Sequence, residues 1–315
     1  MTKIIAEFCQ NHLGDTEILQ KMISSAHING ATHAKIQGLY SDEITKRIQF
    51  EDPKGKLYRP FQNEYERLKK LDLSFEIEKW FVETCKSQSI IPMITVFTHK
   101  GADRARKAGF KNIKIASYDC ASIPLIERVL DFASELVIST GATFWDEIIK
   151  TAEFISSKKN INQEIAFLHA KTIYPTRIEQ FGLARMLALK SFGYMYGLSD
   201  HSRPEDCHLV PSKAAILLGA DYLERHFTVL DRSLSKDGPI SITPSDLSEL
   251  SRFVSLTKSQ QRRDISFEEF QKVFLCDSLE PSDEELLNRS YYRGRVASKY
   301  EGKTVYGWEE LHFET

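Results

Sequence analysis

The chain alternates short β-branched runs with longer amphipathic stretches, and this alternation constrains the fold more than any other feature. It favours parallel strands joined by helical crossovers, and eight such strands are the number in a (β/α)8 barrel. We therefore predict an α/β fold, a TIM barrel. A doubly wound open sheet is the alternative, but the first turn, "EFCQNHLGD", lacks the GxGxxG typical of that fold. The predicted strands span residues 3–10, 32–40, 90–98, 112–119, 135–140, 164–170, 194–201 and 221–228.

Amphipathic stretches between these strands are predicted to be helices. Gly30, Gly109 and Gly219 stand where three of them should end, as glycines that follow a helix commonly do. The predicted helices include residues 15–30, 99–110, 144–158, 204–219 and 243–256.

Two segments exceed a minimal barrel. Residues 41–73 form a charged insertion after the second strand, where a loop would open onto the catalytic face. We interpret it as a candidate lid, with a solvated surface excursion as the equal alternative. We assign residues 1–258 to the barrel. Residues 259–315 are a mostly helical C-terminal extension, expected to pack on the barrel or on a partner chain.

Composition excludes several functional classes. The net charge of -2 argues against nucleic acid or an anionic membrane as a partner. No apolar run is long enough for a signal peptide or a membrane span. The 5 cysteines are scattered without a CxxC spacing, which favours reduced thiols and a cytoplasmic location over a disulfide framework or zinc ribbon.

Polar residues gather where the predicted strands end, which is the active-site face of a barrel. Lys35 and Lys114 are flanked by apolar residues, so we expect both to point into the barrel, where lysines suit a phosphate or carboxylate. "MYGLSDHS" and "YLERHFTVLD" contain His201 and His226, which with a carboxylate such as Glu7 could hold a divalent cation. Each of these residues alone could have a purely structural role, but all eight predicted strands end in polar residues, which favours a functional site. Other strand-end residues are Thr95, Ser117, Asp119, Ser139, His169, Ser199 and Glu224.

Eight motifs carry a resemblance to a known family. They are "AEFCQNHLGD", "AKIQ", "ITVFT", "KIASYD", "ISTGAT", "LHAKTIYPT", "GLSDHS" and "GADYLERHFTVLDR". In this order, over residues 3–258, the chain resembles the sialic acid synthase family. Members of that family condense phosphoenolpyruvate with an amino sugar to make nonulosonic acids.

The resemblance implies roles for particular residues. His201 and His226 would bind a divalent metal, manganese above all, with magnesium or cobalt as alternatives. Glu7 and Asp119 would handle protons near the metal and the sugar, and Lys114 completes the predicted catalytic set. The substrate-binding residues so implied are Lys35, Thr95, Ser117, Ser139, Tyr174, Ser199 and Asp237.

The chain departs from the family pattern on the sugar side. "KDGPISITP" lacks the family's Asp after Gly-Pro, and Asp237 is the stand-in. Lys171 and Thr172 replace small or amide side chains. We also expect the family's C-terminal antifreeze-like domain, whose arginine grips the sugar in the partner's site, to be lacking. Candidate replacements for that arginine are Arg289, Arg293 and Arg295.

The sequence thus predicts a phosphoenolpyruvate-dependent synthase with an altered acceptor. The acceptor would be an N-acetylmannosamine-like or diacetamido hexose, and phosphate would be released. A related barrel synthase or aldolase with a Schiff base on Lys114 is one alternative, and a non-catalytic phosphoenolpyruvate-binding relative is another. The resemblance also implies a homodimer.

Overall fold

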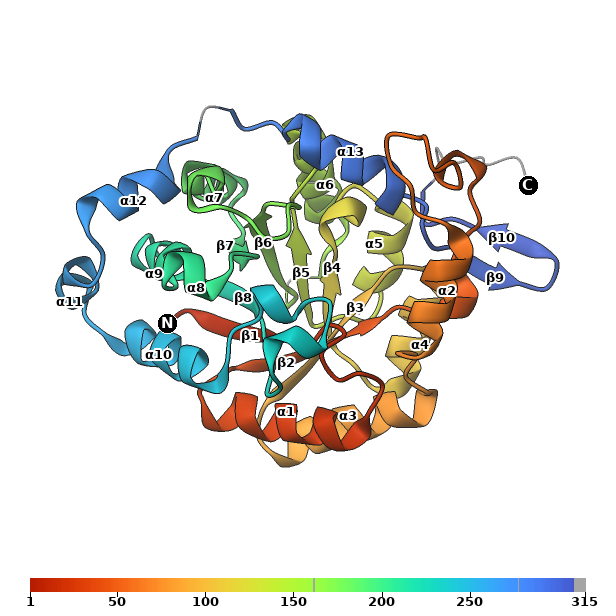
Figure 1. Ribbon diagram of the computed structural model, residues 1–315, viewed down its shortest axis with the longest axis horizontal. Coiled ribbons are helices and arrows are strands. Elements are labelled where there is room, and N and C mark those ends of the chain that lie inside the picture. The colour runs from red at the N-terminus through yellow and green to blue at the C-terminus, as the bar shows by residue number, and fades with distance from the viewer. Residues whose placement is uncertain (161, 277, 309–315) are drawn as a thin grey trace.

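Eight parallel strands close into a barrel in the computed structural model, which describes residues 1–160, 162–276 and 278–308 (Figure 1). The first strand pairs with the last, since Glu7 stands opposite His226, and this pairing closes the barrel. The (β/α)8 prediction is confirmed, and every predicted run contains a strand. The strands are β1 Lys3–Glu7, β2 His33–Gly38, β3 Ile91–Val96, β4 Asn112–Ile115, β5 Glu135–Ser139, β6 Glu164–Ala170, β7 Met195–Asp200 and β8 Tyr222–His226.

Helices surround the strands, and three of them end where glycines were predicted to end them. Gly30, Gly109 and Gly219 have φ of 90°, 96° and 89°, the left-handed conformation that glycine adopts without a steric penalty. The outer helices are α1 Thr16–Ile28, α3 Phe75–Ser87, α4 His99–Ala108, α5 Ile123–Leu130, α6 Trp145–Lys158, α7 Leu183–Leu189, α8 Pro204–Cys207, α9 Val210–Leu217 and α10 Pro244–Ser255.

One predicted helix, residues 204–219, is wrong as a single element. It is divided into α8 and α9, because His208 and Leu209 adopt left-handed φ of 47° and 64°. Pro211 follows in the first turn of α9. Proline has no N–H to donate to the carbonyl of Cys207, so a continuous helix would lose that bond.

Successive strand residues point alternately outward and inward, and this sorts the core into two parts. Outward residues such as Ile4, Ile36 and Ile113 pack beneath the helices in the large hydrophobic core. Inward residues form a small separate cluster that fills the lower barrel. Its buried members are Ile5, Met93, Val137, Ala166, Leu168 and Tyr222. Two residues after Ile5 on β1 and after Tyr222 on β8, the inward positions are the charged Glu7 and Glu224, so the polar site lies next to this apolar cluster.

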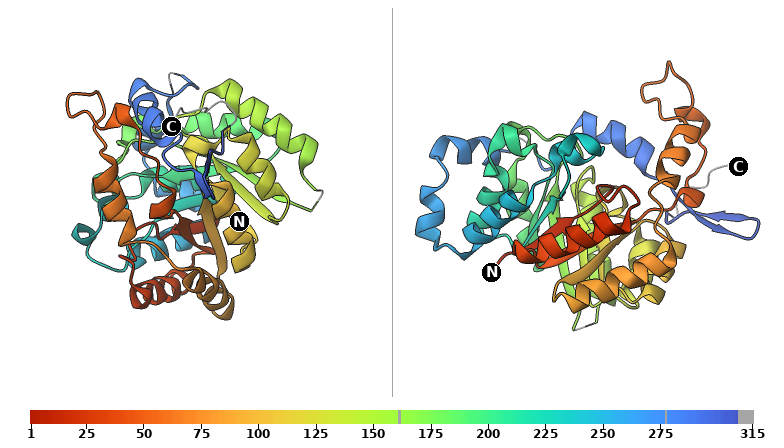
Figure 2. Two further views of the ribbon diagram at one scale, coloured as in Figure 1. Left: turned by 90° about the vertical axis from the view of Figure 1, so that its right-hand side faces the viewer. Right: turned by 60° about the horizontal axis from the view of Figure 1, so that its bottom comes forward.

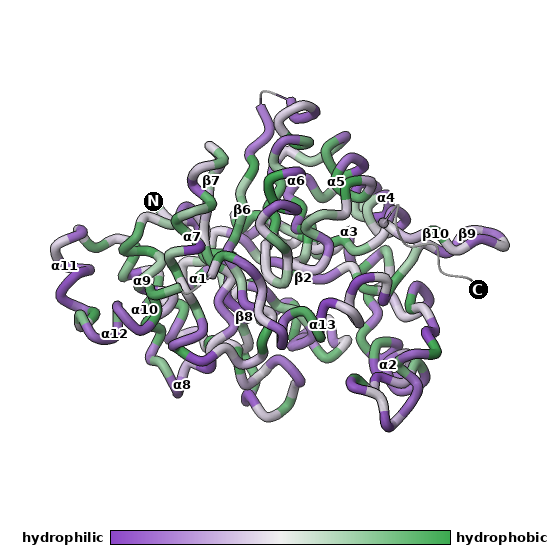
Figure 3. Tube along the Cα trace, turned by 90° about the horizontal axis from the view of Figure 1, so that it is seen from above, coloured by the Kyte–Doolittle hydropathy of each residue, from purple (hydrophilic) through white to green (hydrophobic). Residues whose placement is uncertain are grey.

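Two long connections extend beyond the barrel. The insertion contains the short helices η1 Ser41–Glu43 and η2 Ile48–Phe50 and then α2 Phe61–Lys69. The C-terminal extension contains α11 Lys258–Arg263, α12 Phe267–Phe274, α13 Asp283–Tyr292 and the hairpin β9 Ser298–Tyr300 with β10 Lys303–Val305. Figures 1 and 2 show α11 and α12 at one end of the molecule and the β9–β10 hairpin at the other. The outer segments, α2 and the hairpin among them, carry many hydrophilic residues (Figure 3).

The insertion and the extension are joined to one another by hydrogen bonds. The Arg47 guanidinium donates to the carbonyl oxygen of Arg293 at 2.9 Å, and Thr45 Oγ1 donates to that of Gly294 at 2.7 Å. Thr45 N–H donates to the carbonyl oxygen of Arg295 at 2.9 Å. We call residues 41–73 and 278–297 together the roof. No helix in the described part of the chain has the length and apolar character needed to cross a membrane.

Candidate active site

A cavity of about 560 Å³ opens at the carboxyl ends of the barrel strands. Strand ends line its deep part, which we call the floor, and residues of the roof line its outer part. The structure therefore brings nearly all of the predicted site residues together. The predicted residues that line the cavity are Glu7, Lys35, Thr95, Lys114, Ser117, Ser139, Tyr174, Ser199, His201, His226 and Asp237.

Two buried lysines and two buried glutamates form the centre of the floor. Lys35 is ion-paired with Glu7 and, at 3.1 Å, with Glu224. Lys114 Nζ lies 4.0 Å from Glu224 Oε2. All four side chains are at least nine-tenths buried, so each charge depends on its neighbours rather than on water.

These four groups perturb one another's pKa values in opposite directions. Burial lowers the pKa of Lys114 to about 8, whereas Glu224 and Glu7 outweigh burial at Lys35 and raise its pKa. Burial raises the pKa of Glu7. Burial also tends to raise the pKa of Glu224, but the charges of Lys114 and Lys35 outweigh burial and lower the pKa of Glu224 to about 2. Two carboxyl groups with pKa values pushed apart are typical of acid–base sites.

Hydroxyl groups surround the two ammonium groups. Lys35 Nζ donates to Thr95 Oγ1 at 3.1 Å, and Lys114 Nζ donates to Ser139 Oγ at 2.5 Å. Ser199 Oγ donates to Glu224 Oε1 at 2.9 Å. Ammonium and hydroxyl donors at this spacing suit the oxygens of a compact anion such as a phosphate or carboxylate.

The two predicted metal ligands stand side by side at one edge of the floor. The rings of His201 and His226 are edge to face, with centroids 5.4 Å apart, and the half-exposed Tyr174 packs on His201 at 4.5 Å. His201 Nδ1 is 2.8 Å from the carbonyl oxygen of Lys171, so it carries the proton and Nε2 has the electron pair, with Ser199 Oγ 3.4 Å away. Burial lowers both histidine pKa values, to about 3 for His226, which keeps the imidazoles neutral.

A fully buried ion pair supports both histidines from behind. Asp200, which precedes His201, lies 2.5 Å from the guanidinium of Arg225, which precedes His226. Asp200 also accepts a hydrogen bond from Ser212 Oγ at 2.5 Å. Because β7 and β8 are tied together at this point, the backbone positions of both imidazoles are fixed.

The loop after β8 brings Asp237 to the same edge as the histidines. Asn11 Nδ2 donates to the carbonyl oxygen of Phe227 at 2.8 Å and to Ser241 Oγ at 2.9 Å, so β1 and this loop are held together. Cys9 Sγ lies 2.9 Å from Asp237 Oδ2. One potential metal-binding atom from each of Cys9, His226 and Asp237 lies within 4.8 Å of the other two.

Asp119 is the one predicted site residue that does not line the cavity. Its buried carboxylate accepts a hydrogen bond from Trp308 Nε1 at 3.2 Å, and Trp308 in turn packs against the Arg293 guanidinium. Burial raises the pKa of Asp119 to about 7. The C-terminal extension therefore covers this carboxylate in the described structure.

The roof contributes further charged groups around the cavity. Glu64 is ion-paired with Arg295 and, at 2.7 Å, with Arg67, and both arginines line the cavity. Lys171 pairs at 3.0 Å with Glu285, a residue of α13. Among the three candidate arginines, only Arg295 lines the cavity; Arg289 and Arg293 pair with Glu147, at 2.6 and 2.9 Å.

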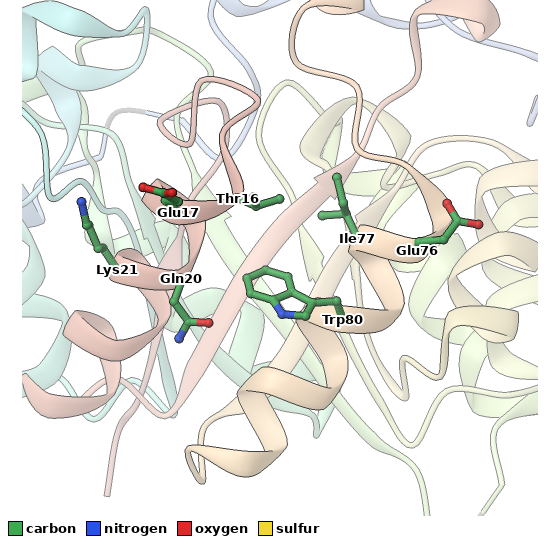
Figure 4. A pocket seen from close by; sticks show the side chains of 7 residues that line it. All are labelled: Thr16, Glu17, Gln20, Lys21, Glu76, Ile77 and Trp80. Atoms are coloured by element: carbon green, nitrogen blue, oxygen red, sulfur yellow. The ribbon is translucent and has the colours of Figure 1, made fainter.

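A second hollow, of about 660 Å³, lies outside the barrel between α1 and α3 (Figure 4). Its charged residues do not converge, because Glu17 and Lys21 lie on the α1 side and Glu76 on the α3 side. The strand-end cavity is therefore the candidate active site.

Comparison with known proteins assigns this barrel to a family. The model of the NeuB family matches residues 22–264, more than half of the chain. The chain belongs to the NeuB family. This confirms the resemblance on which the site predictions rested.

Several curated relatives of this NeuB-family chain are named as synthases of nonulosonic acids. A protein of Campylobacter jejuni named N,N'-diacetyllegionaminic acid synthase is 29% identical over 252 residues, 79% of this chain and 74% of the relative. A pseudaminic acid synthase of the same organism is 29% identical over 301 residues, 94% of this chain and 81% of the relative. The mouse N-acetylneuraminate-9-phosphate synthase is 25% identical, over 81% of this chain and 70% of its own.

Solved structures support the fold of this NeuB-family chain. The N-acetylneuraminic acid synthetase of Leptospira borgpetersenii matches with a TM-score of 0.67 at 24% identity, over 92% of this chain and 90% of its own. The spore coat polysaccharide biosynthesis protein SpsE of Bacillus subtilis matches with a TM-score of 0.72 at 23% identity, over 91% of this chain and 76% of its own.

The family motifs left several site residues without a role. Glu224 pairs with both floor lysines although it was noted only as a strand-end residue, and its position two residues before His226 on one face of β8 was the available signal. Glu285 gave no such signal, because its partner Lys171 lies far away in the sequence.

Proposed function

We propose that this NeuB-family chain condenses phosphoenolpyruvate with the open-chain aldehyde of an amino sugar, forms a nonulosonic acid and releases phosphate. The convergence of Lys35, Lys114, Thr95, Ser139 and Ser199 on one buried floor carries this proposal. Two ammonium groups and three hydroxyls suit the phosphate and carboxylate of phosphoenolpyruvate. The named synthases among the relatives support nonulosonic acids as the class of product.

In the proposed reaction, carbon 3 of phosphoenolpyruvate attacks the aldehyde carbon and forms the new C–C bond. Water then adds at carbon 2, and Glu7 takes the proton that this water gives up, because burial raises the pKa of this carboxyl group and makes its carboxylate a stronger base. The tetrahedral intermediate collapses with C–O cleavage and expels inorganic phosphate. One phosphoenolpyruvate, one aldehyde and one water thus give one nonulosonate and one phosphate.

We further propose that His201 and His226 hold a divalent cation, for which the resemblance implies manganese. The fit is supported by the neutral, adjacent imidazoles and by the buried His226 Nδ1, which has no hydrogen-bond partner. A divalent cation supplies an electrophile for the aldehyde oxygen. Asp237, on the same edge, is proposed to contact the sugar and to orient the aldehyde.

The proposal gives Asp119 no step in this reaction. The position of its carboxylate against Trp308, outside the cavity lining, favours Glu7 as the proton acceptor. The predicted role of Asp119 in proton handling stays a prediction, and the Asp119→Asn variant in the Discussion tests it.

The test is release of inorganic phosphate from phosphoenolpyruvate across a panel of N-acetylated and diacetamido hexoses with added Mn²⁺. We expect release with at least one sugar and its loss in His226→Ala. Binding of phosphoenolpyruvate without release for any sugar would favour a non-catalytic relative. Borohydride trapping of pyruvate on Lys114 would favour an aldolase and contradict the proposal.

We also propose a homodimer in the cytoplasm. The free cysteines, of which Cys9, Cys85, Cys120 and Cys207 are buried, suit a reducing compartment. The family resemblance is the ground for the dimer. Light scattering on the purified chain tests the dimer, and a monomer mass at micromolar concentration would contradict it.

A further inference from the structure

Cys9 has no role in the proposed reaction, yet its thiol lies at the edge of the cavity beside the metal-binding histidine. One atom each of Cys9, His226 and Asp237 lies within 4.8 Å of the others, and the thiol sulfur is 2.9 Å from Asp237 Oδ2. Cys9 and His226 are buried, and Asp237 is half-buried. A thiol, an imidazole and a carboxylate are three side-chain types that bind transition metals.

The backbone holds the thiol in this position by an uncommon conformation. Cys9 has a φ of 45°, in the left-handed region that residues other than glycine rarely adopt. Its N–H donates to Glu7 Oε1 at 2.5 Å, which fixes the turn directly after β1. Strained residues that the surrounding structure maintains are concentrated at functional sites.

His226 provides an independent sign of a missing partner. Its side chain is more than nine-tenths buried, and its Nδ1 is buried without a hydrogen-bond partner. Buried polar atoms are satisfied in the great majority of cases, so an unpaired nitrogen on a histidine that lies beside a thiol and a carboxylate points to a bound ion.

We propose that Cys9, as a thiolate, and Asp237 join His226 as direct ligands of the catalytic cation. The inference rests on the proposed function for the presence of a cation, and it changes the class of ion. Thiolate and imidazole ligands favour Zn²⁺, Co²⁺ or Fe²⁺, whereas Mn²⁺ and Mg²⁺ prefer oxygen. The site would therefore select a softer cation than the manganese that the resemblance implies. On binding, the thiol proton passes to solvent and sulfur donates its electron pair to the ion.

The structural alternative is a simple hydrogen bond from the Cys9 thiol to Asp237. A thiol is a weak donor, so this hydrogen bond alone offsets little of the conformational cost of a left-handed backbone at Cys9. It also leaves the His226 Nδ1 unsatisfied. A shared cation accounts for all three side chains together.

The test is titration of the chelator-treated full chain with Co²⁺, followed by absorption spectroscopy. Sulfur bound to Co²⁺ gives an intense near-ultraviolet charge-transfer band that nitrogen and oxygen ligands do not give. We expect this band in the wild type and in the control Cys276→Ser, a cysteine of the extension. We expect its loss in Cys9→Ser, with Co²⁺ affinity lowered at least about tenfold. Asp237→Asn should keep the band and bind Co²⁺ more weakly.

Wild-type protein that binds one equivalent of Co²⁺ without this band would overturn the inference, and so would a band that persists in Cys9→Ser. Circular dichroism checks that each variant is folded, and the wild-type spectrum decides even if Cys9→Ser is not. Phosphoenolpyruvate binding and phosphate release are measured on the same preparations. If the wild type neither binds phosphoenolpyruvate nor releases phosphate, the proposed function is contradicted. If it does both but shows no charge-transfer band, only the assignment of Cys9 as a thiolate ligand is contradicted.

Discussion

The floor and the roof of the cavity are built in different ways. The floor consists of short strand ends whose side chains are buried and paired within the barrel, as Lys35 is with Glu7 and Glu224. The roof consists of long charged side chains that are still partly in contact with solvent, such as Arg67 and Glu64. The register of the barrel fixes the floor, whereas the roof depends on contacts between two distant segments.

This difference separates two tasks in the proposed reaction. The floor carries groups that suit phosphoenolpyruvate, the substrate that all members of such a family would share. The roof carries the groups that reach the outer cavity, where the acceptor sugar would lie. We therefore expect floor variants to lose phosphoenolpyruvate binding and roof variants to change the acceptor preference.

The largest effect is expected for Lys35→Met. The variant removes an ammonium donor and leaves Glu7 and Glu224 buried beside one another with one cation fewer. Phosphoenolpyruvate affinity should fall by about tenfold to a hundredfold, since a hydrogen bond to a charged group contributes about 1.5–3 kcal/mol. Isothermal calorimetry measures it. Affinity within threefold of the wild type would remove Lys35 from the phosphoenolpyruvate site.

A pH effect of about tenfold is expected from Lys114. Its pKa of about 8 means that the ammonium form dominates below pH 8 and is lost above it. The affinity for phosphoenolpyruvate, an anion, should therefore fall by up to about tenfold between pH 7 and 9. Calorimetry from pH 7 to 9.5 follows the change. Lys114→Met serves as the control and should bind weakly with no such pH dependence.

A smaller, selective effect is expected for the roof variant Arg295→Ala. It removes a cavity-lining guanidinium and leaves Arg67 as the remaining partner of Glu64. The KM for the sugar should rise by about threefold to tenfold, while the affinity for phosphoenolpyruvate stays unchanged. Arg289→Ala is the matched control, because Arg289 does not line the cavity. An equal loss of phosphoenolpyruvate affinity in Arg295→Ala would abolish the distinction between floor and roof.

The smallest effect is expected for Asp119→Asn, measured as a change in Tm. Burial raises the native pKa to about 7, whereas an unfolded aspartate has a pKa of about 3.9. The native state therefore binds more protons, and this residue lowers stability progressively as pH rises from about 4 to 7. Asparagine removes that cost, so its gain in Tm should grow over this range and reach a few °C at pH 8.

Turnover of the same variant sharpens the comparison. Asparagine can still accept the hydrogen bond from Trp308, so the extension should stay docked. Near-normal phosphate release is expected. A loss of several orders of magnitude would place Asp119 among the catalytic groups, as the resemblance implied, and would mean that the extension moves to uncover it.

The residues of the floor could be predicted from the sequence because the pattern that identifies them lies in their immediate neighbours. Lys35 in "AKIQ" and Lys114 in "IKIAS" lie between apolar neighbours, and alternation along a strand then sends both inward. The pairing of both with Glu224 needed the barrel register, which no single segment contains.

The long-range ion pairs of the roof could not be predicted from the sequence, because they join distant segments of the chain. Lys171 was noted as a departure from the family, and the structure pairs it with Glu285 of α13. Such pairs join segments more than a hundred residues apart, and neither residue lies in a local sequence pattern from which its partner could be predicted. Asp119 shows the same limit, because the motif supplies the carboxylate, whereas Trp308, which covers it, lies far away in the sequence.

The hydrogen bonds from Arg47 to the carbonyl groups near Arg293 can form only late in the synthesis of the chain. The ribosome makes these two residues 246 positions apart, which at ~5–20 residues per second is an interval of roughly 12 to 49 s. During that interval the insertion is already outside the ribosome without its hydrogen bonds to the extension. A nascent chain should therefore be cut by proteases within residues 41–73 until the segment around Arg293 emerges, and resist them afterwards.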